Sequence, residues 1–146
     1  MKKLDDSALL VARVLMPILF IVAGYGKLGT GYAGTQKYMA AMGVPGFLLP
    51  LTILLEVGGG LAVLFCLLTR SVALITVVFT LLTAFIFHAD FTQAGNQINF
   101  MKNLTIAGGY LLLAVSGPGA FSIDRLVAKK GNRLPTSPAG PSGSGA

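Results

Sequence analysis

One acidic residue lies in the middle of an apolar run that is long enough to cross a lipid bilayer. Between Phe47 and Leu68, Glu56 is the only charged residue, and it lies near the midpoint. A carboxylate at that depth costs about 2.5–3.5 kcal/mol on insertion scales. It therefore needs a cationic partner, a bound proton or a function, which makes Glu56 the candidate catalytic group.

Further charged and polar residues lie near the ends of the apolar segments, where their side chains could meet a ligand. Counted at about 1.5 Å of rise per residue, Arg13 lies one and a half turns inside the first segment. Lys27 ends that segment, and His88 and Asp90 follow the third. The candidate binding residues, for a quinone or a lipid head group, are Arg13, Lys27, Glu56, His88, Lys102 and Asn103.

Each candidate also has a purely structural interpretation. Arg13 could form a buried ion pair with Glu56, or it could extend to lipid phosphates. Lys27, His88 and the residues near 102 could simply anchor the chain at the membrane interface. Gly58, Gly59 and Gly60 could leave a slot for a flat ligand, but close packing of helices is the favoured interpretation.

Composition excludes several classes of function. Only 11% of the 146 residues are charged and 54% are hydrophobic, with a mean hydropathy of +0.78, whereas soluble domains carry roughly 25% charged residues. The net charge is +6, and the basic residues flank apolar segments without lining one face of a helix. This arrangement favours contact with lipid head groups over binding of nucleic acid. A single histidine and the single Cys66 supply no haem, metal or disulfide-exchange site, and no nucleotide-binding loop is present.

Four apolar segments without strand alternation predict an all-α, polytopic membrane protein built as a four-transmembrane-helix bundle. The chain 1–127 is expected to form this domain, with a short interfacial helix over 33–42 in the first outer loop, ended by Gly43 and Pro45. The Pro-, Gly- and Ser-rich stretch 128–146 is expected to be a disordered cytoplasmic tail. The expected spans cover about 8–26, 47–68, 71–87 and 102–117.

Lysine and arginine are concentrated at the N-terminus, at the turn around Arg70 and after residue 124. Because basic residues in short loops stay in the cytoplasm, both termini are predicted to be cytoplasmic.

Several of these residues occur together in one family. Arg13 with Gly26 and Lys27 at the two ends of the first span, Leu55–Gly60 in the second, and Lys102 with Asn103 before the fourth make the chain similar to the DoxX family of small bacterial membrane proteins. The resemblance covers about residues 1–127. It implies a multi-pass protein of the bacterial inner membrane with a link to quinone-dependent oxidoreductases.

Three functions remain open from the sequence. In the first, the chain is a membrane subunit of a quinone-linked oxidoreductase: Glu56 exchanges a proton, and Lys27, His88 or Lys102 binds the ring. In the second, it is a non-catalytic protein that docks a lipid, a partner protein or a second copy of itself. The third, less favoured, is a small transporter.

Overall fold

The computed structural model describes residues 2–117. The predicted tail at 128–146 and the last part of the predicted membrane domain lie outside that range. The described residues form helices and turns and contain no strand, which confirms the all-α prediction. Four helical stretches are long and apolar enough to cross a membrane: Asp6–Gly26, Gly46–Leu64, Thr69–Phe87 and Asn96–Ser116.

The helices follow one another with short connections. α1 runs over Lys2–Gly26 and α2 over Gly31–Ala41. The second span is composite: a 3₁₀ turn at Gly46–Leu48, α3 at Leu49–Ile53, a π-helical turn at Leu54–Gly58 and α4 at Gly59–Leu64. α5 covers Thr69–Phe87 and α6 covers Asn96–Ser116.

Helix α2 is the short helix expected in the first loop, and it begins two residues and ends one residue earlier than predicted. It ends at Ala41, and Gly43 adopts a φ of +77°, a left-handed conformation that favours glycine at this position. The amide of Val44 then closes the end of the helix on the carbonyl of Met39 at 2.9 Å. Gly43 and Pro45 were therefore sufficient to predict from the sequence where this helix ends.

Two span boundaries differ from the prediction. The second span ends at Leu64, because Cys66 and Leu68 adopt left-handed backbone conformations that reverse the chain before α5. The fourth helix begins at Asn96, ahead of the expected start at Lys102. The first turns of this helix are polar, so hydropathy does not reveal where it begins. At its start, Gly95 adopts a φ of +86° and the Asn96 side chain donates a hydrogen bond to the carbonyl of Asp90.

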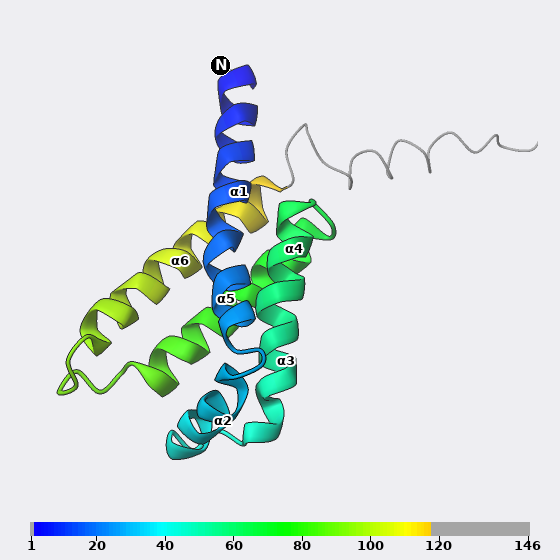
Figure 1. The fold of residues 1–146 in the computed structure, drawn as a ribbon. Coiled ribbons are helices and arrows are strands. Elements are labelled where there is room, and N and C mark those ends of the chain that lie inside the picture. The colour runs from blue at the N-terminus through cyan, green and yellow to red at the C-terminus, as the bar shows by residue number, and fades with distance from the viewer. Residues whose placement is uncertain (1, 118–146) are drawn as a thin grey trace, which may run out of the picture.

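The helices form two antiparallel pairs that meet at one end of the bundle (Figure 1). α1 packs along the second span, and α5 packs along α6. The pairs are close where α5 contacts α4, and they diverge toward the end that carries α2. We call the end where α5 contacts α4 the closed end, and the opposite end, which carries α2, the α2 end.

The face of α1 that packs inward repeats every three or four residues, as helical geometry requires. Arg13, Pro17, Phe20 and Gly24 are buried, and the Phe20 ring meets the Tyr110 ring edge to face at 5.5 Å. The inward face of α5 is made of small residues, which are Thr69, Ala73, Thr76, Thr80 and Ala84. Large apolar side chains such as Leu15, Val22 and Leu112 point outward, as expected for a lipid-facing surface.

Two glycines set the distance between α1 and the second span. A Cβ atom on Gly24 would lie 2.6 Å from Val57 Cγ2 and 2.9 Å from Glu56 Cβ. A Cβ atom on Gly60 would lie 2.7 Å from Ile21 Cγ1. Close packing was the favoured interpretation of Gly58, Gly59 and Gly60, and at Gly60 the second span does pack closely against α1.

Substituting Gly24→Ala should separate the two helices beside Glu56. We expect a loss of about 1–3 kcal/mol in the free energy of unfolding, because the new methyl group overlaps packed atoms. Reversible unfolding by SDS in mixed micelles measures it. Gly108→Ala is the matched control, because a Cβ atom there meets nothing within 4 Å; it should be neutral or stabilise the protein by up to about 1 kcal/mol, because alanine favours the helix. Equal losses in both variants would contradict the close-approach explanation.

Candidate functional site

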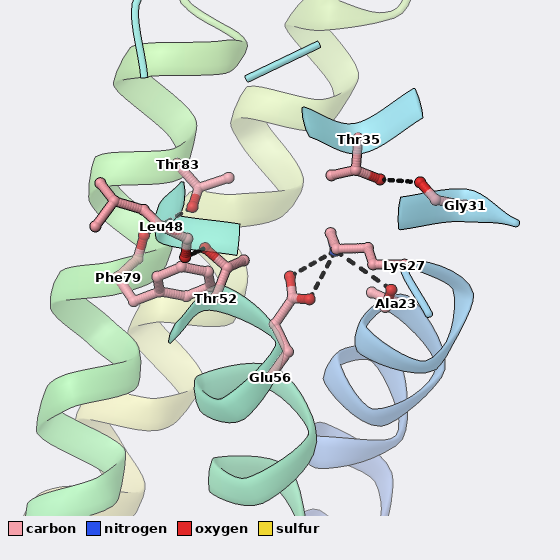
Figure 2. A network of polar contacts seen from close by, with 9 residues as sticks. All are labelled: Ala23, Lys27, Gly31, Thr35, Leu48, Thr52, Glu56, Phe79 and Thr83. Carbon is pink, nitrogen blue, oxygen red and sulfur yellow. Dashed lines mark hydrogen bonds and ion pairs between the residues drawn. The ribbon is translucent and has the colours of Figure 1, made fainter. Parts of the chain in front are cut away.

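Glu56 forms an ion pair with Lys27 (Figure 2). Lys27 Nζ lies 2.8 Å from Glu56 Oε1 and 2.7 Å from Oε2, and it also donates to the carbonyl of Ala23 at 3.3 Å. The Glu56 side chain is 9% exposed and that of Lys27 is 24% exposed. The carboxylate thus has the cationic partner that its position requires.

The backbone around Glu56 is unusual. Leu54–Gly58 forms a π-helical turn, a wider turn that often marks functional positions in helices. The turn lies opposite Gly24, where α1 comes closest to Glu56. Together they bring the carboxylate beside the end of α1, where Lys27 begins the following turn.

The predicted pairing of Arg13 with Glu56 is wrong. Arg13 is 1% exposed, and it donates from Nη1 to Cys66 Sγ at 2.7 Å and from Nε to the carbonyl of Leu9 at 3.3 Å. Glu56 lies eight residues, or about 12 Å of helix, before the end of the second span at Leu64, and Cys66 lies beyond that end. Arg13 therefore stabilises the closed end and is too far from Glu56 to pair with it. Its burial also argues against an extended conformation that reaches lipid phosphates.

A cavity of about 430 Å³ lies beside the ion pair, between α2, the second span and α5. This volume lies within the range of small-molecule sites, roughly 300–1,000 Å³. Most of the lining is apolar, as in Leu48, Leu55 and Phe79. The polar side chains in the lining are Lys27, Thr35, Tyr38, Thr52, Glu56, Thr83 and His88.

The α2 end of the cavity is bridged by aromatic side chains. The ring of Tyr38 on α2 stacks on the ring of Phe87 at the end of α5, with centroids 5.5 Å apart. Both residues line the cavity. This contact connects α2 to the diverging helix pair.

His88 is held by the loop that joins α5 to α6. Its Nδ1 lies 3.3 Å from Asn96 Oδ1, and Asn96 Nδ2 donates to the carbonyl of Asp90 at 2.9 Å. The Asp90 carboxylate accepts hydrogen bonds from the hydroxyl and the amide of Thr92 and from Gln93 Nε2. These bonds lower the pKa of Asp90 below its usual range. Asn96 connects the ring of His88 to the backbone of this loop.

The structure brings three of the six candidate binding residues together: Lys27, Glu56 and His88 line one cavity. Arg13 lies at the closed end. Lys102 is exposed and donates to Asn99 Oδ1 at 3.0 Å, and Asn103 is half-buried on α6. Neither Lys102 nor Asn103 lines the cavity.

The sequence argument missed the threonines of the site. Thr52 precedes Glu56 by four residues and so shares its helix face, a signal that helical periodicity could have supplied. Thr35 and Thr83 come from α2 and α5, and only the packing of these helices reveals them. Gly58, Gly59 and Gly60 do not line the cavity, so the less favoured interpretation, a slot for a flat ligand, does not hold. Gly59 faces Val72 and Gly60 faces α1.

Comparisons with known proteins agree with this architecture. The family model of DoxX matches residues 8–89, which is more than half of the chain, and the chain belongs to the DoxX family. It is therefore a multi-pass inner-membrane protein.

Two proteins of Escherichia coli (strain K12) are similar along most of their length. Inner membrane protein YqjF is 70% identical over 130 residues, covering 89% of this chain and 99% of that protein. Inner membrane protein YphA is 40% identical over 124 residues, covering 80% of this chain and 88% of that protein. No solved structure matches the chain.

Removing one member of the ion pair should cost more than removing both. Lys27→Met leaves the Glu56 carboxylate without its cation, and we expect a loss of about 2 kcal/mol in the free energy of unfolding, less than for a fully buried pair because Lys27 is partly exposed. Adding Glu56→Leu to that variant should recover at least half of the loss. SDS unfolding of the wild type, both single variants and the double variant gives the coupling energy. Additive losses would show that the pair contributes nothing beyond its separate side chains.

Proposed function

We propose that the cavity binds the ring of a quinone-class lipid and that the chain is the membrane subunit of a quinone-linked oxidoreductase system. The observation that carries this proposal is a mostly apolar cavity whose wall contains an ion pair with a carboxylate. Apolar walls suit a lipid-soluble ring, and the few convergent polar groups suit its oxygen atoms.

The surroundings of the cavity support a ligand that arrives through the bilayer. Leu51, Leu82 and Ile86 line the cavity and are also 56%, 55% and 41% exposed. These side chains lie on the second span and α5, the two helices that diverge. A ligand dissolved in the hydrocarbon could enter between them without crossing the polar surface. With both termini in the cytoplasm, as the basic residues indicate, the cavity would occupy the outer half of the membrane.

Within this proposal each polar residue has a distinct role. Glu56 accepts or releases the proton that accompanies a change in the redox state of the ligand. Lys27 is a positioning residue that keeps the carboxylate oriented toward the cavity. A quinone supplies the two-electron chemistry when it is bound. The electrons would be exchanged with a partner protein docked on the membrane subunit.

A second candidate function rests on the ion pair itself. Lys27 and Glu56 join α1 to the second span, so the pair could serve as a helix clamp in a non-catalytic assembly protein. In that case the cavity would hold an acyl chain without selectivity. The two functions differ in what the cavity retains on purification.

Filling the cavity should displace a bound quinone. Protein purified from quinone-containing membranes in mild detergent should retain close to one quinone per chain, measured by solvent extraction and chromatography of total oxidised and reduced forms. Thr83→Phe places a ring in the cavity, and we expect at least about a tenfold fall in retained quinone, because overpacking excludes the ligand.

Val78→Phe is the matched control for this experiment. Val78 is on the same helix, is 58% exposed and does not line the cavity. It should retain the wild-type amount. If the wild type carries no more quinone than its co-purified phospholipid predicts, the quinone proposal is wrong and the assembly function is favoured.

A further inference from the structure

The three threonines of the cavity have already used their hydroxyl protons. Thr35 Oγ1 donates to the carbonyl of Gly31 at 2.8 Å, Thr52 Oγ1 to that of Leu48 at 3.2 Å, and Thr83 Oγ1 to that of Phe79 at 2.9 Å (Figure 2). A carbonyl oxygen has no proton to give, so in each contact the threonine is the donor. What each hydroxyl can still offer a ligand is a lone pair.

Lys27 directs most of its donor capacity at the protein itself. The two oxygens of Glu56 lie in nearly the same direction from Nζ and the carbonyl of Ala23 lies in another, which leaves at most one of the three ammonium protons for a ligand. Glu56, in contrast, keeps accepting capacity. A carboxylate has about four lone-pair positions, of which the two bonds from Lys27 occupy two. The ion pair therefore also presents acceptors.

The loop orients the ring of His88 so that it, too, presents an acceptor to the cavity. Asn96 Nδ2 donates to the carbonyl of Asp90, so the amide oxygen of Asn96 is the atom that faces His88 Nδ1. An oxygen acceptor there requires the proton on Nδ1. In the neutral ring Nε2 is then an acceptor. Among the described polar side chains of the lining, Tyr38 alone keeps a hydroxyl that the contacts do not assign as donor or acceptor.

We propose that the cavity selects a hydrogen-bond donor: the hydroxyl-bearing, reduced form of its ring ligand, the quinol, over the carbonyl-bearing quinone. This inference rests on the proposed function and adds the redox form of the ligand. A quinol hydroxyl can donate to Glu56 or to a threonine oxygen. A quinone carbonyl could pair only with the Tyr38 hydroxyl or the remaining proton of Lys27, and it would leave the acceptors of Glu56 and the threonines unmatched. Sites built for a donor strongly reject analogues that lack it.

The test is a binding comparison on the full chain reconstituted in nanodiscs. The probes are a radiolabelled decyl-substituted 1,4-benzoquinol kept reduced under argon, the corresponding quinone under air, and the dimethyl ether of the quinol. The ether keeps the ring and loses both donors. Empty nanodiscs correct for partitioning into lipid. We expect the quinol to bind at least about tenfold more tightly than either the quinone or the ether.

Two threonines of α5 provide a matched pair of variants. Thr83 and Thr76 both donate to the carbonyl four residues earlier, at 2.9 Å and 2.8 Å, but only Thr83 lines the cavity. Thr83→Val should weaken quinol binding about three- to tenfold and leave quinone binding unchanged. Thr76→Val should preserve the wild-type preference. Thr52→Val is the second cavity variant, should Thr83→Val accumulate poorly.

The outcomes separate the two proposals. A quinone or an ether that binds as tightly as the quinol overturns the donor preference and leaves the proposed site standing. Binding of no probe above empty nanodiscs overturns the proposed function and, with it, the preference. An equal effect of Thr83→Val and Thr76→Val would show that the lining hydroxyl does not contact the ligand, and the donor argument would fail.

Discussion

A carboxylate inside an apolar bundle must be neutralised, and the ion pair between Lys27 and Glu56 meets this requirement. The surrounding structure makes the pair geometrically achievable. Lys27 follows the last turn of α1, while Glu56 lies well inside the second span. Gly24 lets α1 approach the backbone at Glu56 and Val57, and the π-helical turn lies at that level. The pair therefore depends on one close helix–helix approach, and mutations at that approach act on the site.

The same interaction explains why the site presents acceptors. A lone lysine at this depth would donate to any ligand, and a lone glutamate would compete for any cation. When the two residues are paired, Lys27 directs most of its protons at Glu56 and Ala23, and the carboxylate keeps part of its accepting capacity. The threonines have the same property, because each hydroxyl donates its proton to the backbone carbonyl four residues earlier. Local satisfaction of donors is thus the physical basis of the proposed preference for a ligand that donates a hydrogen bond.

Hydropathy and charge were sufficient to predict four spans, the α2 helix with its end near Gly43, and Glu56 as the central polar residue, because these depend on properties of single segments. They failed to identify the partner of Glu56. Pairing depends on depth, and Arg13 lies near Cys66 rather than near the carboxylate. The start of α6 and the threonines of the cavity were missed for a related reason. The hydrogen bond from the Asn96 side chain to the carbonyl of Asp90 and the contact of α2 with α5 depend on loop and tertiary geometry, which sequence periodicity does not encode.

The two ends of the bundle are built differently, and the cavity lies at the end where the helix pairs diverge. At the closed end, small residues of α5 and the buried Arg13 allow the helix pairs to meet closely. At the α2 end the pairs diverge (Figure 1), and the large side chains of Leu51 and Leu82 line the cavity there. The stack of Tyr38 on Phe87 bridges α2 and α5 there. A ligand approaching through the lipid would meet apolar side chains first and the acceptors of the ion pair last. A ligand with a long apolar tail and a small head group that donates a hydrogen bond would therefore fit this arrangement.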